Sequence, residues 1–150
     1  MTTEAMIGHG TRFQIYDADA SPPAWVTVAE IVSVTPPSMT RDTVDATHAE
    51  SPEKWREYIP GLRDGGEVSL EMNFIPDGAG TTTIMQTFNK DTVVTCRIIF
   101  PDGDPEASPI TATVWQFSGF CTNFAPAAPF DNKMSATATF KLSGKPQFLS

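Results

Sequence analysis

Positive charge is scarce in this sequence. It contains 10 Lys and Arg against 18 Asp and Glu, which gives a formal net charge of −8 and a pI near 4.5. Proteins that bind nucleic acid replace the counterions of the phosphates with Lys and Arg side chains. Because these residues are few and scattered along the chain, the composition argues against a protein that binds DNA or RNA.

Histidine and cysteine are also scarce, with two residues of each type. Neither His9 nor His48 has a second His or a Cys at the spacing of metal ligands, so the sequence predicts no zinc site. Cys96 and Cys121 fall in separate predicted strands, where a cross-strand disulfide is conceivable. We favour two buried free thiols, because a cytoplasmic chain keeps its cysteines reduced.

Motifs of catalysis and cofactor binding are missing as well. The sequence has no G-x-S-x-G elbow, and the stretch 102–104 (DGD) lacks the remaining ligands of a calcium loop. The stretch 77–81 (DGAGT) lacks the Gly-Lys-Ser/Thr ending of a phosphate loop, so we interpret it as a turn before a helix. A carboxylate pair on one strand, Glu67 and Glu71, has no identifiable partner for acid–base chemistry. We expect no enzymatic activity and no cofactor.

Long apolar runs are absent too: no apolar stretch approaches the ~20 residues that are needed to span a bilayer. The N-terminus has neither a basic start nor an apolar core, so we expect no secretory signal and no membrane association. The apolar fraction of 40% is that of an ordinary globular protein. We expect a single domain over residues 1–150.

Period-two alternation indicates a mainly β fold. In the clearest strand, 66–75, Val68, Leu70, Met72 and Phe74 share one face. The final strand likewise directs Met134, Ala136, Ala138, Phe140 and Leu142 inward. The predicted strands are 10–16, 25–35, 66–75, 92–100, 111–124 and 132–142, and the predicted helix is 81–89 with a Thr as N-cap. We expect a β-sandwich or flattened barrel of about six or more strands with one short α-helix, an N-terminal arm (1–9) and a C-terminal arm (143–150).

The stretch 36–65 shows no sustained periodicity, and we interpret it as a long loop. It nevertheless carries four large apolar side chains, Trp55, Tyr58, Ile59 and Leu62, which a solvated linker does not need. Such a loop is expected to fold against its own domain or against a neighbouring molecule.

The stretch WREYIPGLRDGGEVSLEMNF, from Trp55 to Phe74, resembles the signature of lambda-type tail tube proteins of long-tailed phages. The shared pattern is an acidic and Thr-containing segment, then R-E-x-I-P-G-L-x-D-x-G-E-V-S, then a strand. A weaker likeness extends to SGKP at 143–146. The resemblance implies a structural virion protein whose hexameric rings stack into a tube, with the long loop and the terminal arms bridging subunits. It assigns to the loop the inter-subunit residues Asp42, Asp45, Trp55, Arg56, Glu57, Tyr58, Ile59, Pro60, Gly61, Leu62, Arg63 and Asp64.

The same resemblance makes Glu67 and Glu71 candidates for the lumen face, where negative charge keeps DNA mobile without specific binding. It implies as partners other copies of the chain, the tape measure, the tail tip or initiator and the tail terminator. The expected location is the virion tail, after assembly in the host cytoplasm. Some relatives continue into an immunoglobulin-like domain, and we expect none here. Two alternatives stay open: a related tube or terminator protein, including tubes like those of type VI secretion, and a small-molecule-binding β-barrel enzyme.

Overall fold

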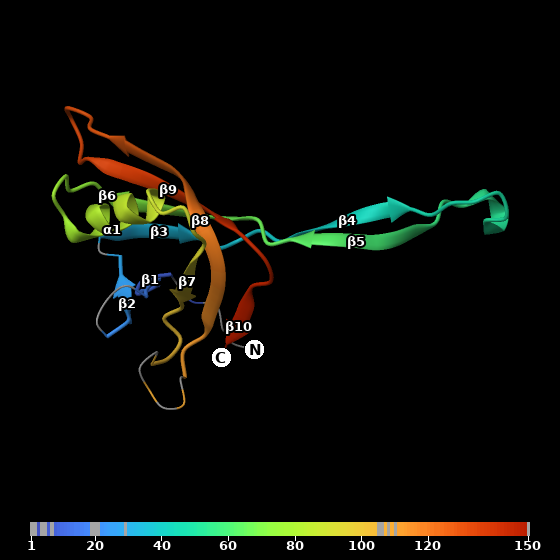
Figure 1. The fold of residues 1–150 in the computed structure, drawn as a ribbon, viewed down its shortest axis with the longest axis horizontal. Helices are drawn as coiled ribbons and strands as arrows, with labels where there is room; N and C mark the ends of the chain where they lie inside the picture. The colour runs from blue at the N-terminus through green and yellow to red at the C-terminus, as the bar shows by residue number, and fades with distance from the viewer. Residues whose placement is uncertain are drawn as a thin grey trace.

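A computed structural model of the chain describes residues 3, 6, 8–18, 22–28, 30–104, 107, 109 and 111–149. Its main element is one antiparallel sheet of eight strands, to which a separate two-stranded hairpin is attached (Figure 1). The elements are β1 (Arg12–Asp17), β2 (Ala24–Thr27), β3 (Ile31–Thr35), β4 (Thr40–Asp45), a 3-10 turn (Pro52–Lys54), β5 (Tyr58–Asp64), β6 (Glu67–Asn73), α1 (Ala79–Phe88), β7 (Val94–Ile99), β8 (Val114–Ala127), β9 (Ser135–Leu142) and β10 (Gln147–Leu149). The mainly β class with one α-helix is confirmed.

The large sheet has the order β2-β1-β7-β8-β9-β6-β3, and β10 pairs with β8 beside this path. It is curled, so that β1 and β3 approach each other although several strands separate them in the order. The curled sheet encloses an apolar core. Phe13 lies at its centre, completely buried, with its ring 5.3 Å from the ring of Phe140 and 6.2 Å from that of Phe117.

Strand β6 has the predicted register. Val68, Leu70 and Met72 are buried, whereas Glu67 and Glu71 on the opposite face are exposed. The strand is paired on both sides, with β9 and with β3, and its apolar face enters the core. The alternation in the sequence therefore identified both the strand and its buried face.

The single strand predicted over 25–35 is wrong, because the structure has two strands there. β2 pairs with β1 and β3 pairs with β6, so the break takes the chain from one end of the sheet order to the other. Glu30, at the break, has a φ of 63°, a left-handed conformation. Since neither Gly nor Pro marks this break, the β-branched run gave no signal of it.

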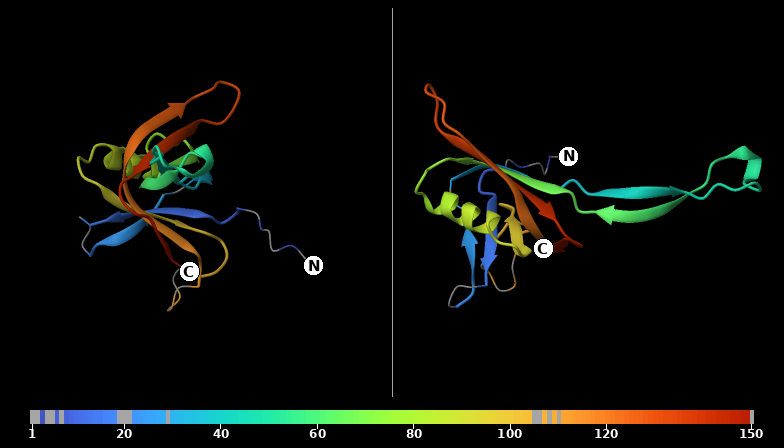
Figure 2. Two further views of the ribbon diagram at one scale, coloured as in Figure 1. Left: turned by 90° about the vertical axis from the view of Figure 1, so that its right-hand side faces the viewer. Right: turned by 45° about the horizontal axis from the view of Figure 1, so that its top comes forward.

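The interpretation of 36–65 as an irregular loop is also wrong. β4 and β5 pair from Thr40 opposite Asp64 to Asp45 opposite Tyr58, with a register shift between Arg41 and Thr43. The resulting hairpin projects away from the sheet and the helix (Figures 1 and 2). Because both of its faces are exposed, the strands need no alternation of apolar and polar residues, and the edge position tolerates Pro60.

Three smaller expectations also need correction. The helix begins at Ala79, two residues earlier than predicted, and Gly78 rather than a Thr is its N-cap. Met134 precedes β9 and is exposed rather than inward. In the C-terminal arm, 147–149 form β10, where Phe148 packs edge-on against Trp115 at 5.0 Å. Most of the predicted N-terminal arm (1, 2, 4, 5 and 7) lies outside the described residues.

Both cysteines are free and buried, as predicted. Burial raises the pKa of the Cys96 thiol to about 12, and the nearby Cys121 adds to this shift. The pKa of Cys121 is also raised, chiefly by burial. Each thiol therefore packs as a small apolar side chain.

The hairpin joins the large sheet at a neck where its two legs almost touch. Gly66 has a φ of +79°, and a Cβ atom there would lie 2.3 Å from the backbone oxygen of Ser38. We expect Gly66→Ala to lower the free energy of unfolding by about 2–4 kcal/mol, since it combines a left-handed φ with a backbone clash. Urea unfolding measures this loss, and Gly144→Ala is the control. Gly144 has a similar φ of +84°, but no atom beyond its chain neighbours lies within 4 Å of a Cβ placed there. If Gly144→Ala lowered the free energy of unfolding as much as Gly66→Ala, the clash with Ser38 would not be the cause.

Candidate assembly surface

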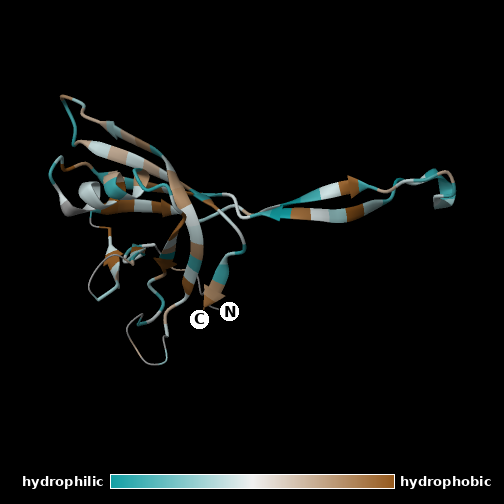
Figure 3. Cartoon of the chain, viewed as in Figure 1, coloured by the Kyte–Doolittle hydropathy of each residue, from teal (hydrophilic) through white to brown (hydrophobic). Residues whose placement is uncertain are grey.

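The hairpin carries the exposed apolar residues that the sequence singled out. Leu62 is 83% exposed, Trp55 71%, Tyr58 55% and Ile59 52%. Val44, which the sequence analysis did not single out, lies opposite Ile59 in the register and is itself exposed. Figure 3 shows that hydrophobic residues lie on both β4 and β5 of this projection. Exposed apolar side chains concentrated on a projection indicate a contact surface.

The tip of the hairpin has a defined structure, in which Glu57 is the central residue. Its carboxylate accepts a hydrogen bond from Ser51 at 2.7 Å and lies 3.2 Å from His48 Nε2. Its backbone N–H donates to the Thr47 hydroxyl. Hydrogen bonds from Thr47 also lower the pKa of Asp45 below its usual value. The tip thus presents Trp55 on an ordered turn, which lowers the entropic cost of a contact.

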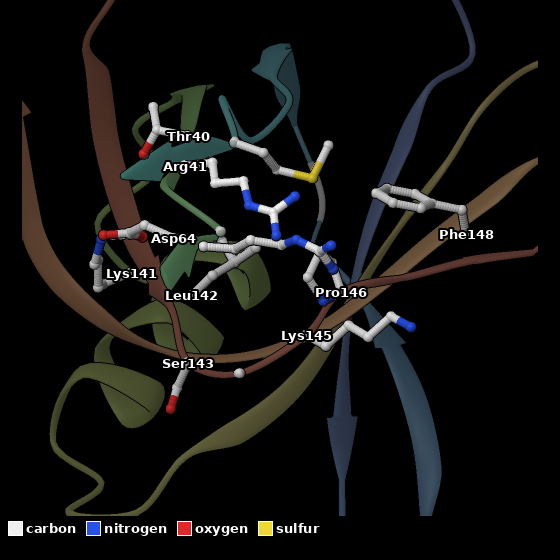
Figure 4. A pocket seen from close by; sticks show the side chains of 13 residues that line it. Thr40, Arg41, Asp64, Lys141, Leu142, Ser143, Lys145, Pro146 and Phe148 are labelled. Carbon is white, nitrogen blue, oxygen red and sulfur yellow. Dashed lines mark hydrogen bonds and ion pairs between the residues drawn. The ribbon is translucent and has the colours of Figure 1, made fainter. Parts of the chain in front are cut away.

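A cleft of about 740 Å³ lies at the base of the hairpin, and we call it the basal cleft (Figure 4). Its charged residues are Arg41, Arg63, Asp64, Lys141 and Lys145. They come from β4, β5, β9 and the stretch 143–146 that joins β9 to β10. The remaining lining residues are Met39, Thr40, Gly65, Leu142, Ser143, Gly144, Pro146 and Phe148.

One ion pair closes a side of the basal cleft. Lys141 Nζ lies 2.9 Å from Asp64 Oδ1, and this contact, followed by the N–H of Gly66, lowers the pKa of Asp64. Figure 4 shows this pair at one edge, whereas Arg41 extends into the cleft. The sequence analysis did not identify Arg41, Lys141 and Lys145 as site residues. The elements that carry them, β4, β9 and the stretch 143–146, come together only in the folded chain.

The face of the sheet opposite the core is polar around Glu67 and Glu71. Glu71 lies opposite Thr137 on β9 and Ser33 on β3, and Glu67 lies opposite Lys141. Ser69 and Thr139 complete a surface of small hydroxyl side chains, the two carboxylates and Lys141, whose ammonium group is paired with Asp64. Such a surface offers little attraction to apolar groups or to nucleic acid phosphates.

A second apolar surface lies beside α1. Phe74, Met85, Phe88, Phe124 and Pro126 line a shallow hollow, in which Met85 and Phe88 are nearly half exposed. The sequence predicted helical spacing for Ile84, Met85 and Phe88, but only Ile84 enters the core. This hollow is a further exposed apolar surface.

The described residues show no group of three or more His, Cys, Asp or Glu that could hold a metal ion. The stretch 102–104 forms a turn, in which the Asp102 carboxylate accepts hydrogen bonds from the hydroxyl and the backbone N–H of Thr113. Within the described part of the chain, no helix is long and apolar enough to cross a membrane.

A family model described as lambda phage tail tube protein matches residues 8–149. No curated protein matches the chain. Among solved structures, a chain from the tail of an empty gene transfer agent particle, refined with C6 symmetry, has a TM-score of 0.74 at 21% identity, and the match covers 97% of this chain and 100% of that one. A chain from the virion of a native gene transfer agent particle has a TM-score of 0.73 at 22% identity, and the match covers the same shares of the two chains. The SPP1 tail tube has a TM-score of 0.73 at 8% identity, and the match covers 96% of this chain and 78% of that one.

Proposed function

This chain belongs to the lambda phage tail tube protein family, and we propose that it forms hexameric rings that stack into the tube of a phage-type tail. It is a structural protein and not an enzyme, in keeping with that family. The observation that carries the proposal is the projecting hairpin, whose apolar residues Trp55, Tyr58, Ile59 and Leu62 are exposed in the single chain. These residues become buried when the hairpin contacts another subunit.

The predicted inter-subunit residues share this one projection. Asp42 and Asp45 lie on β4, Trp55, Arg56 and Glu57 lie at the tip, and the stretch 58–64 forms β5. In the proposed tube this surface forms the contact between rings, because six hairpins extend from each ring toward the next. The gene transfer agent tail refined with C6 symmetry supports six subunits per ring.

We assign the polar face around Glu67 and Glu71 to the lumen. Six copies at −8 each give a ring a formal charge of −48, and negative charge along the bore repels DNA phosphates. DNA therefore passes without binding, and salt changes the strength of the repulsion. The remaining partners in this proposal are the tape measure, the tail tip or initiator and the tail terminator, and assembly takes place in the host cytoplasm before the tube becomes part of the virion tail.

Electron microscopy of the purified protein over a concentration series, with light scattering alongside, tests the proposal. We expect hollow tubes or stacked rings, with six-fold end views and scattering that rises steeply above a threshold concentration. A protein that stays monomeric at every concentration, and also when it is produced together with its tail initiator, would contradict the assignment.

A further inference from the structure

We infer that the basal cleft of one subunit receives the acidic outer hairpin, residues 42–57, of a second copy of this chain in the adjacent ring. The inference rests on the proposed tube formation and adds to it the surface on which the hairpin docks. It also gives the contact a chemical character, the attraction of carboxylates by a cluster of guanidinium and ammonium groups.

The basal cleft concentrates the scarce positive charge of the chain. Four of the 10 cationic residues line it, namely Arg41, Arg63, Lys141 and Lys145, against the one carboxylate of Asp64. Asp64 is already paired with Lys141. The cleft is therefore cationic on a protein whose net charge is −8.

Two of these cations are in an unfavourable position in the isolated subunit. Arg41 and Arg63 lie directly opposite each other in the β4–β5 pairing. Like charges directly opposite on paired strands destabilise a hairpin. A carboxylate placed between the two guanidinium groups removes this repulsion and accepts hydrogen bonds from both. The arrangement thus favours an anionic ligand.

The outer hairpin has the opposite charge. Residues 42–57 include five carboxylates, against Lys54 and Arg56. Two of the carboxylates already have partners within the hairpin: Asp45 lies 4.0 Å from Arg56, and Glu57 lies 3.2 Å from the imidazole of His48. Glu50 and Glu53 form no ion pair with any described residue, and both are exposed at the tip.

The hairpin has the reach to join these two surfaces on different subunits. Its leg from Thr40 to the tip is on the order of 40 Å long at ~3.3 Å per extended residue. The body of a domain of this size has a diameter on the order of 35 Å. Because the hairpin is extended, its tip lies far from its own basal cleft (Figures 1 and 2). It can, however, pass along one neighbouring body to the base of that neighbour's hairpin.

Such a contact joins two different surfaces of identical chains. A contact of this kind either closes into a ring or continues as an open polymer. Repetition of the tip-to-base contact along the direction of the hairpin gives continuous stacking, as a tube requires. A nucleic acid in the cleft is a less favourable occupant, because the carboxylates on the rest of the surface repel phosphates.

Reversal of the charges on each surface tests the inference. The cleft variant is Arg41→Glu with Arg63→Glu, and the tip variant is Glu50→Lys with Glu53→Lys. We expect each variant alone to remain folded by circular dichroism and to raise the threshold concentration for tubes at low salt on the order of 100-fold. In an equimolar mixture the tip of each variant is complementary to the cleft of the other, so we expect tubes in which the two variants alternate and are present in equal amounts.

The matched control for the cleft variant is Lys90→Glu with Lys133→Glu, which changes the net charge equally outside the cleft. This control is expected to form tubes near the wild-type threshold. If the wild type forms tubes and the cleft variant forms them equally well, the docking inference is wrong but the proposed function stands. If the wild type forms no tubes, the proposed function itself is contradicted. A mixture that fails to assemble would overturn the charge pairing. Tight binding of a single-stranded oligonucleotide by the wild type, lost in the cleft variant, would assign the cleft to nucleic acid instead.

Discussion

Leu70→Asp is expected to leave no folded protein. Leu70 is completely buried in β6, opposite Ala138 on β9 and Val34 on β3. Loss of the leucine side chain from a packed core costs about 2–5 kcal/mol. The new carboxyl group must in addition be buried without a partner, at a further cost of several kcal/mol. The sum is comparable to the whole stability of a typical domain, about 5–15 kcal/mol.

The measurement is the yield of soluble protein together with its near-ultraviolet circular dichroism. Val68→Asp is expected to behave in the same way, because Val68 lies two residues away on the same buried face. The matched control is Glu71→Asp, next to Leu70 but on the exposed face, which should fold normally. A soluble Leu70→Asp protein with a native spectrum would show that the register of β6 is wrong.

The sequence could predict the body of the fold but not the hairpin, and the reason is burial. On β6 and β9 one face enters the core, so apolar and polar residues must alternate, and this alternation is visible in the sequence. On β4 and β5 neither face is covered within the chain. In the proposed tube the side chains there contact another subunit instead of a core, and their pattern in the single chain resembles an irregular loop.

The candidate site was predictable only in part, for a similar reason. Trp55 and Leu62 could be recognised because large apolar residues stood out in a polar stretch. The basal cleft could not, because Arg41 and Lys145 are far apart in the sequence and acquire a joint role only when β4 and the stretch after β9 meet. A local motif cannot report a cluster that long-range pairing creates. The break between β2 and β3 escaped notice because Glu30 adopts a left-handed conformation that Gly more often supplies.

Trp55→Ala combined with Tyr58→Ala is expected to abolish tube formation and to leave the subunit folded. In the isolated chain both side chains are more than half exposed, and exposed substitutions change stability by roughly 0.5 kcal/mol or less. Once buried against another subunit, each becomes an aromatic anchor, of the kind whose truncation costs about 2 kcal/mol or more. Together they weaken each contact on the order of 1,000-fold, and the contact recurs six times in every ring of the proposed tube.

The threshold concentration for tubes, followed by light scattering and electron microscopy, measures this effect. Trp55→Phe with Tyr58→Phe is the matched control, because it keeps two aromatic rings on the same ordered tip and should retain assembly with a moderate loss. Neither variant changes a charged residue of the hairpin. Any change in the threshold concentration therefore measures the apolar contribution to the contact and not the electrostatic one. If the alanine variant forms normal tubes at the wild-type threshold, the exposed aromatic residues do not hold the rings together, and the attraction between the outer hairpin and the basal cleft must supply the stacking energy alone.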